Sequence, residues 1–315
     1  MTQEAYSEQI QKLLDSLVGE LSTAIDARTP HNANHTRNMA QYAVRFLDWL
    51  EETGNPWRFA PDRRRAFLLA VWLHDVGKLV VPLAVMDKQS RLGPALNEVE
   101  HCFSDMELLD HIAVLEGRLT EDQSRERQQQ RQTGLDLIYE LNCADVLSRE
   151  DQEAVRHLSR QTYRDQHGET RPWLTEREAE CLSIPRGTLT YGEREVMKSH
   201  VVMTKRILDQ VSFPPVYADA PKWAAAHHEL LNGSGYPDHL TAEDIPREVR
   251  LLTVLDIFEA LTARDRPYKA GIPADRALDI LRSMAEEGSL DGEIVALFAD
   301  SRAWEGLLPG ENSPE

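Results

Sequence analysis

The chain has 315 residues, of which 41% are hydrophobic, so it is long enough to bury a substantial core in one large domain or two ordinary ones. Acidic residues outnumber basic residues by 53 to 35, and the formal net charge is −18. A surface this negative repels nucleic-acid backbones and anionic lipids, which argues against a nucleic-acid polymer or a membrane as a partner.

The remaining composition is that of a cytoplasmic protein. No run approaches the roughly 20 apolar residues of a membrane span, and the N-terminal residues include acids where a secretory leader would be basic. The three cysteines are scattered without a CxxC spacing, which indicates neither a disulfide framework nor a zinc-thiolate site. We therefore expect a soluble protein of the reducing cytoplasm.

Apolar residues recur at spacings of three and four almost throughout, which predicts an all-α fold. The expected helices of the N-terminal part cover residues 6–27, 30–52 and 61–76. The first is amphipathic and is treated as a separate N-terminal helix, residues 1–28, with Leu17 and Leu21 on its apolar stripe. Thr29 and Pro30 are residue types that favour the start of the second helix. Gly77 is expected to break the third.

Residues 89–182 are rich in Glu, Gln and Arg and predict an inserted helical hairpin or small bundle. Its apolar stripes are Leu108, Ile112 and Leu115, and then Leu135, Ile138 and Leu141. Two interpretations remain open for this insertion, namely a solvated helical elaboration and a surface for a homodimer or a protein partner. The N-terminal helix is the other candidate for such a contact.

The C-terminal part returns to apolar helices. Thr190 to Glu193 has the spacing of a capping box and predicts the start of a helix. The inward face of that helix is expected to contain Val196, His200, Met203 and Ile207. Further helices are expected before His227, over 249–262, over 274–284 and over 292–298, with a Gly-rich turn at 232–237. Residues 29–88 and 183–315 are therefore predicted to form one domain, into which residues 89–182 are inserted.

Seven side chains that can ligate metals lie on or beside the predicted apolar helix faces. They are His35, His74, Asp75, His200, His227, His228 and Asp256. A single histidine on such a face is more often a hydrogen-bonded core residue, and Asp256 alone could pair with an arginine or a backbone amide. Taken together, five imidazoles and two carboxylates without metal would leave many desolvated polar groups in the core. We predict that they converge on two metal ions, with Asp75 as the bridge.

This ligand set also indicates a reaction class. Imidazole and carboxylate ligation without cysteine favours iron, manganese, nickel or zinc over calcium. Two such ions polarise phosphoryl oxygens and lower the pKa of a shared water molecule until hydroxide forms near neutral pH. Phosphoester hydrolysis is therefore the expected chemistry.

The ordered motifs resemble the HD-GYP branch of the HD phosphohydrolase superfamily. The residues that carry this resemblance are 35–37 (His-Thr-Arg), 74–78 (His-Asp-Val-Gly-Lys), His200, 227–229 (His-His-Glu), 232–237 (Asn-Gly-Ser-Gly-Tyr-Pro), 256–262 (Asp-Ile-Phe-Glu-Ala-Leu-Thr) and 266–269 (Arg-Pro-Tyr-Lys). The resemblance implies an all-helical bundle that hydrolyses cyclic di-GMP to linear pGpG, GMP or both, with iron or manganese as the expected metals.

The resemblance also implies roles for individual residues. One metal would be held by His35, His74, Asp75 and Asp256, and the other by Asp75, His200, His227 and His228. Lys78 would stabilise charge on the attacked phosphate, Arg266 and Lys269 would contact phosphate, and Tyr236 would form a wall of the site. Arg266 and Lys269 could instead be a solvated surface pair, and Tyr236 could be purely architectural. Glu229 could orient a ligand histidine or lie on the surface.

His31 is a departure from the family pattern. It precedes His35 by four residues and would share a helix face with it, so it is either a ligand of a third metal or an exposed histidine near the helix start. The leading hypothesis is therefore a cyclic di-GMP phosphodiesterase with two divalent metals, or three if His31 is a ligand. The alternatives are a phosphohydrolase for another cyclic dinucleotide or nucleotide, and a weakly active signalling scaffold.

Overall fold

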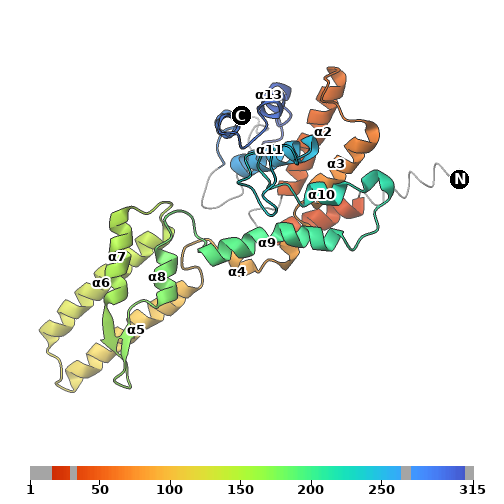
Figure 1. Cartoon of the computed structure of the whole chain (residues 1–315). Coiled ribbons are helices and arrows are strands. Elements are labelled where there is room, and N and C mark those ends of the chain that lie inside the picture. Colours follow the sequence, from red (N-terminus) through yellow and green to blue (C-terminus); the bar gives the residue numbers. More distant parts are fainter. Residues whose placement is uncertain (1–15, 29–33, 264–270, 309–315) are drawn as a thin grey trace. The chain divides into compact units, whose positions relative to one another are not determined.

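A computed structural model of the chain describes residues 16–28, 34–263 and 271–308 (Figure 1). Apart from one pair of short strands, the regular secondary structure of these residues is helical, which confirms the all-α prediction. The chain divides into two compact units, one formed by Met1–Leu83 and Val196–Glu315 and the other by Ala84–Glu195. No described helix combines the length and the apolar character that crossing a membrane requires.

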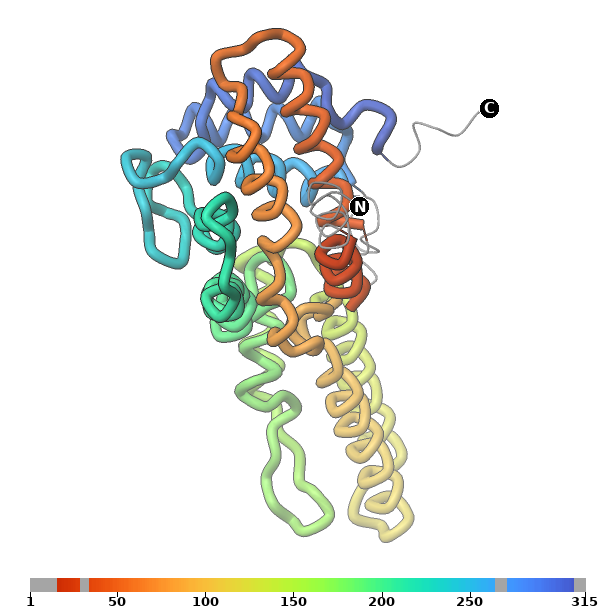
Figure 2. Tube along the Cα trace, turned by 90° about the vertical axis from the view of Figure 1, so that its right-hand side faces the viewer, coloured from red at the N-terminus to blue at the C-terminus, as the bar shows by residue number. Residues whose placement is uncertain are grey.

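The first unit contains a helix over residues 16–26 and a set of helices that pack around one core. They are α2 (His35–Glu52), α3 (Pro61–Leu73), η2 (Val76–Val80), most of α9 (Tyr191–Leu208), η3 (Pro215–Tyr217), α10 (Ala220–Ala224), α11 (Arg247–Thr262), α12 (Ala274–Glu286) and α13 (Gly292–Ser301). Helices α2 and α3 lie side by side (Figure 2). Phe258 of α11 lies at the centre, with ring centroids 5.9 Å from Tyr42 and 5.1 Å from Phe298. Aromatic packing thus joins α11 to α2 and α13.

The described part of the N-terminal helix packs on the rest of the first unit through Ile25 and through polar contacts. Its Leu17 and Leu21 are 63% and 46% exposed, so these two members of the predicted apolar stripe do not face the core. The buried Asp26 carboxylate instead accepts hydrogen bonds from the Thr36 backbone amide and hydroxyl of α2. Arg28 donates to the carbonyl oxygens of Lys78 and Val81. This helix therefore holds both α2 and η2.

Two helix boundaries compare with the sequence prediction as follows: one lies partly outside the described residues and one differs. Helix α2 begins at His35 with Asn34 as its N-cap, and the predicted start at Thr29 and Pro30 falls outside the described residues. Helix α3 ends at Leu73, three residues earlier than predicted, so Gly77 lies inside the 3₁₀-helix η2 and is not the helix break. The prediction for Gly77 was wrong because its backbone is needed for a close contact with α9, which the sequence pattern does not reveal.

The second unit contains α5 (Ala95–Leu115), α6 (Glu121–Cys143), α7 (Arg149–Arg160), α8 (Glu176–Leu182) and an antiparallel pair of strands, β1 (Thr162–Arg164) and β2 (Thr170–Pro172). The short helix α4 (Leu83–Met86) precedes them. The core of the second unit includes Ile138 and Leu141 of α6, as predicted. In contrast, Leu108, Ile112 and Leu115 of α5 are 58%, 38% and 74% exposed.

Helix α5 buries a different face because an ion pair makes that face compatible with the interior. Val99, Phe103 and Met106 are buried there together with Asp110. The Asp110 carboxylate pairs with Arg127 at 2.9 Å and also with Arg131 of α6. From sequence alone, a helix face that contains an aspartate is expected to be exposed, because burial of an unpaired carboxylate is costly and its cationic partners are not known in advance.

The capping box predicted at the start of α9 is confirmed. The Thr190 hydroxyl accepts from the Glu193 amide at 3.2 Å, and the Glu193 carboxylate accepts from the Thr190 amide at 2.9 Å. The inward face is partly different from the prediction, since Val196 is 39% exposed and the buried residues are His200, Val201, Thr204 and Leu208. Helix α9 therefore presents His200 and Thr204 to the first unit.

A buried ion pair at the start of α11 gives a test of the fold. Glu248 is fully buried, and its carboxylate accepts two hydrogen bonds from the half-exposed Arg63 guanidinium of α3, one of them at 2.8 Å. Burial alone would raise the pKa of Glu248, but the hydrogen bonds and charge of Arg63 outweigh it and lower the pKa. Because the folded-state pKa is depressed, the pair stabilises the fold above the unfolded pKa of about 4.3 and stops doing so as the pH falls through the folded value.

We therefore expect Glu248→Gln to lower the free energy of unfolding by about 1–2 kcal/mol at pH 7. The difference from the wild type should begin to shrink below pH 4, because the unfolded wild-type chain then binds a proton at this carboxyl, and it should vanish once the pH falls below the depressed folded-state pKa. Urea unfolding at the two pH values measures this. An equal difference at both would show that the carboxylate charge does not stabilise the fold.

Candidate metal centre

All seven predicted ligands lie in the first unit and converge on one point. His35 is the first residue of α2, and His74 and Asp75 lie between α3 and η2. His200 comes from α9, His227 and His228 from the turn after α10, and Asp256 from α11. Only His228 keeps an appreciably exposed side chain, at 27%.

Three of these side chains form one group, which we call the α11 subsite: His35, His74 and Asp256. Their ligand atoms lie within 4.8 Å of one another. His35 Nε2 is 3.2 Å from His74 Nε2 and 3.3 Å from Asp256 Oδ1. All three residues are buried.

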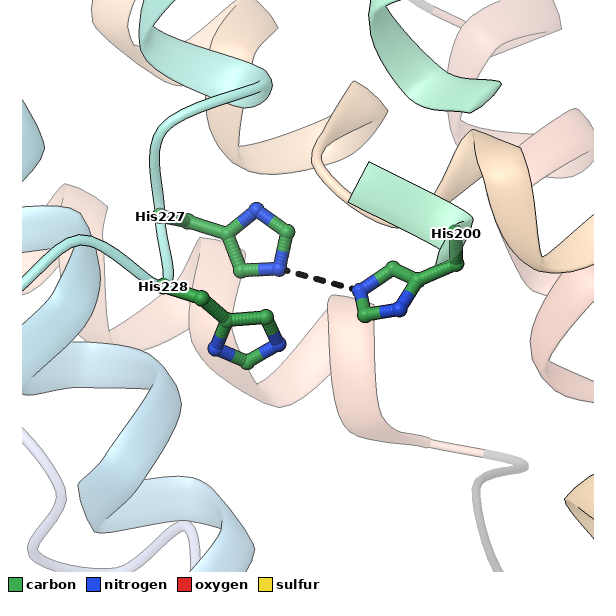
Figure 3. Close-up of side chains that lie close together, drawn as sticks. All are labelled: His200, His227 and His228. Carbon is green, nitrogen blue, oxygen red and sulfur yellow. Dashed lines mark hydrogen bonds between the residues drawn. The ribbon is translucent and has the colours of Figure 1, made fainter. Parts of the chain in front are cut away.

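Three others form a second group, which we call the three-histidine subsite: His200, His227 and His228. Their ligand nitrogens also lie within 4.8 Å of one another. Figure 3 shows the rings of His227 and His228 projecting from the turn toward His200 of α9, with His200 Nε2 3.4 Å from His227 Nε2. The ring centroids of His227 and His228 are 4.1 Å apart.

The Asp75 carboxylate lies between the two subsites. Its Oδ2 is 3.1 Å from His74 Nε2 and 3.5 Å from His35 Nε2, whereas its Oδ1 is 3.3 Å from His200 Nε2 and 4.0 Å from His227 Nε2. Oδ1 is buried yet accepts no hydrogen bond from any described residue. A buried carboxylate oxygen without a donor requires another electrophilic partner. One oxygen facing each subsite is the arrangement of a carboxylate that bridges two cations, so these residues fit a pair of divalent ions.

The ligand histidines are oriented by hydrogen bonds from the nitrogen that points away from the centre. Nδ1 of His74, His200 and His227 lies 2.7 Å from the carbonyl oxygen of the residue three positions earlier. These carbonyls belong to Val71, Met197 and Ala224. A proton donated from Nδ1 leaves Nε2 with its lone pair toward the subsites, as a metal ligand requires.

The protonation of the three-histidine subsite also suits metal binding. Burial lowers the pKa of His200, and burial and the neighbouring His228 lower that of His227 well below its ordinary value. Burial, opposed by Asp256, lowers the pKa of His228 to about 4. Neutral imidazoles at pH 7 need not release a proton before they bind a cation.

The two carboxylates of the centre remain ionised. Burial opposes ionisation of Asp75, but the charges of Lys78 and His74 hold its pKa well below the ordinary value. Asp256 is likewise buried, and its contact with His35 lowers its pKa.

Sequence reasoning assigned no role to Glu259, which lies one turn after Asp256 on α11. Its Oε2 is 2.5 Å from His35 Nδ1, and its Oε1 accepts from the Asn38 amide at 3.0 Å. Although burial opposes protonation, Glu259 and Asp256 together raise the pKa of His35 to about 10. The only sequence signal was a second carboxylate in an apolar helix at a spacing of three. The α11 subsite therefore attracts positive charge, and a metal ion competes with this proton.

Two threonines, also without a predicted role, fix the backbone around the ligands. The Thr204 hydroxyl donates to the His74 carbonyl and accepts from the Gly77 amide, each at 2.9 Å. The Thr253 hydroxyl donates to the His227 carbonyl at 2.8 Å. Because buried threonines are common in helices, the sequence alone does not predict these contacts.

Lys78 lies beside the centre, as predicted from its motif. Its Nζ is 2.6 Å from Asp75 Oδ2. Burial opposes its charge, but Asp75 raises its pKa, so the side chain carries a positive charge. The Lys78 carbonyl is held by Arg28 of the N-terminal helix.

The Gly-rich turn packs directly behind the paired histidines. A Cβ on Gly235 would lie 2.3 Å from the Leu230 amide nitrogen, so only glycine fits there. The Tyr236 ring is 4.8 Å from the His228 ring and 5.5 Å from Lys198 Nζ, which places it at the edge of the three-histidine subsite.

Glu229 fulfils neither of the roles considered for it. It is buried, and its carboxylate accepts from the backbone amides of Asp238 at 2.7 Å and Leu240 at 2.9 Å. It therefore holds the end of the Gly-rich turn. Three other predicted site residues, His31, Arg266 and Lys269, lie outside the described residues.

Comparison with known proteins agrees with this geometry. A family profile described as "HD domain" matches residues 177–294, which include His200, His227, His228 and Asp256. The structure adds His35, His74 and Asp75 to them from outside the matched segment. Residues 177–294 of the chain are thus similar to the HD domain.

Three curated proteins with similar sequences are named as cyclic-dinucleotide phosphodiesterases. The 3'3'-cGAMP-specific phosphodiesterase 3 of Vibrio cholerae is 35% identical over 125 residues, which cover 40% of this chain and 25% of that protein. A cyclic di-GMP phosphodiesterase of Thermotoga maritima is 37% identical over 113 residues, 36% of this chain and 30% of the relative. The cyclic di-GMP phosphodiesterase response regulator RpfG of Xanthomonas campestris is 42% identical over 106 residues, 33% of this chain and 26% of the relative.

The chain therefore spans between 25% and 30% of the length of these three relatives. The matched profile and these similarities support the resemblance to the HD-GYP type that the His-Asp and Gly-Tyr-Pro motifs carry.

Proposed function

We propose that this chain is a metal-dependent cyclic-dinucleotide phosphodiesterase that hydrolyses cyclic di-GMP to pGpG, GMP or both. The observation that supports it most is the Asp75 carboxylate, which has one oxygen toward each of two groups of three ligands. We assign the catalytic domain to residues 29–88 and 183–315, and its location to the cytoplasm.

We assign one divalent ion to His35, His74, Asp75 and Asp256, and a second to Asp75, His200, His227 and His228, with iron or manganese as the metals. When bound, such ions polarise phosphoryl oxygens and lower the pKa of bound water. The role of the protein is to hold these ligands rigidly and to keep the nitrogens of His200, His227 and His228 unprotonated toward the metal, whereas His35 gives up a proton when the metal binds.

Other residues of the site contact the substrate in this proposal. Lys78 carries its positive charge at the edge of the α11 subsite, where it can stabilise charge that develops on a phosphate. Tyr236 forms a wall beside His228. Arg266 and Lys269 are assigned to the substrate phosphates from their motif alone.

A second substrate, 3'3'-cGAMP, is favoured by the names of several Vibrio cholerae relatives. The test incubates protein loaded anaerobically with Mn²⁺ or Fe²⁺ with each cyclic dinucleotide and separates the products by chromatography. We expect linear dinucleotide or GMP from cyclic di-GMP. A protein that holds its metals but turns over neither substrate contradicts the proposal, whereas preferential turnover of 3'3'-cGAMP changes only the substrate.

The role of Lys78 has its own test. Lys78→Met keeps the length of the side chain but removes its charge, and should lower kcat by about 100-fold because a positioned charge in the site is lost. Elemental analysis should find the wild-type metal content, and Lys78→Arg should recover part of kcat. Loss of metal in parallel with activity would instead give Lys78 a role in assembling the centre.

A further inference from the structure

The two subsites carry different charge. The α11 subsite has the Asp256 carboxylate as a ligand and the Glu259 carboxylate directly behind His35. The three-histidine subsite has no carboxylate among its own three ligands, although Asp75 Oδ1 lies 3.3 Å from His200 Nε2 and Asp256 Oδ2 lies 3.6 Å from His228 Nδ1. The Lys78 ammonium, 2.6 Å from Asp75 Oδ2, offsets one negative charge, yet the α11 subsite remains the more negative of the two.

Buried Glu259 contributes to this difference in charge between the subsites. The residue is 2% exposed, and both of its oxygens are engaged, one by His35 Nδ1 at 2.5 Å and one by the Asn38 amide at 3.0 Å. It follows Asp256 by three residues, so both carboxylates lie on the same face of α11. Helix α11 therefore supplies one ligand, Asp256, and also the carboxylate that binds a second ligand, His35.

The group that binds Nδ1 of His35 differs chemically from the groups that bind Nδ1 of the other ligand histidines. His74, His200 and His227 are held by neutral backbone carbonyls, whereas His35 is held by a carboxylate. A carboxylate behind a ligand histidine makes the imidazole a stronger donor to a metal and fixes its orientation. It also adds a negative charge close to the bound cation.

We infer that Glu259 is a positioning residue that makes the α11 subsite the tighter of the two, so that a first divalent cation binds there before a second fills the three-histidine subsite. This inference rests on the metal-binding part of the proposed function. It concerns the order and strength of binding, which are measurable without substrate.

The test is calorimetric titration of chelator-treated wild-type protein with Mn²⁺. We expect two binding phases, with the first dissociation constant lower by at least about 10-fold. Glu259→Gln should weaken the first phase by about 10- to 100-fold and leave the second within about 3-fold. His228→Ala should do the reverse and weaken only the second phase.

Glu248→Gln is the matched control, since it removes a buried carboxylate from the same helix without contact to the centre. Both of its phases should match the wild type. If Glu259→Gln does not fold, as judged by circular dichroism, Asn38→Ala gives a second measurement. Loss of its hydrogen bond to Glu259 should weaken the first phase by about 5-fold.

Different outcomes test the order of metal binding and the existence of the metal centre. Two Mn²⁺ ions bound with equal affinity, or a Glu259→Gln change that weakens both phases alike or neither, would overturn the inference while the metal centre stands. A wild-type protein that binds no stoichiometric Mn²⁺ would overturn the proposed metal centre itself.

Discussion

Replacement of Asp75 by asparagine should abolish bound metal and lower turnover of cyclic di-GMP by at least about 1000-fold, because in the proposed centre Asp75 is the ligand shared by both cations, which would activate water and phosphate. The carboxylate has one oxygen toward each subsite, and the Oδ1 atom accepts no hydrogen bond from the described residues. An amide has the same shape but no charge and only one oxygen. Elemental analysis and initial rates measure the two losses.

The matched control is Asp110→Asn, which changes a buried, ion-paired aspartate of the second unit. It should keep both the metal content and the turnover of the wild type. Asp75→Asn protein that retained two metals would show that Asp75 is not the bridge. Retained turnover after loss of metal would contradict the proposed chemistry as a whole.

Gly77→Ala is expected to have the largest effect on stability. A Cβ at this position would lie 1.9 Å from the His200 carbonyl oxygen and 2.5 Å from the Thr204 amide nitrogen. Both are backbone atoms of α9, so they cannot move aside as a flexible side chain would. We expect the free energy of unfolding of the first unit to fall by about 3 kcal/mol or more.

The same substitution should damage the centre, because η2 and α9 would have to separate. The Gly77 amide donates to Thr204, whose hydroxyl also holds the His74 carbonyl. Thermal unfolding and Mn²⁺ titration measure both effects. Gly192→Ala is the control: its Cβ would meet nothing within 4 Å, and helix propensity favours alanine by about 1 kcal/mol. Equal stability of the two variants would mean that η2 and α9 are not in close contact.

The convergence of the seven ligands could be predicted because each of them is costly to bury alone. Asp256 within an apolar helix and His227 beside His228 are sequence signals of this kind, and the structure brings them together with the others. Glu259 and Thr204 could not be assigned in advance, because their roles depend on which atoms of α2 and η2 lie opposite them. Tertiary pairing is not encoded in helical periodicity.

The same limit explains the exposed stripe of α5. Periodicity alone ranks the face with Leu108 and Leu115 as the more apolar one, yet the helix buries the face that contains Asp110. The cost of that carboxylate is removed by Arg127 and Arg131, which come from another helix. Whether the exposed stripe serves a homodimer or a partner stays a prediction of the sequence.

The most direct test of the metal centre is an anomalous difference map from crystals of the protein grown with Mn²⁺. We expect two peaks, one among His35, His74 and Asp256 and one among His200, His227 and His228, about 3.5–4 Å apart on either side of Asp75. A map without a peak at these side chains, from crystals in which the seven residues are ordered, would contradict the account.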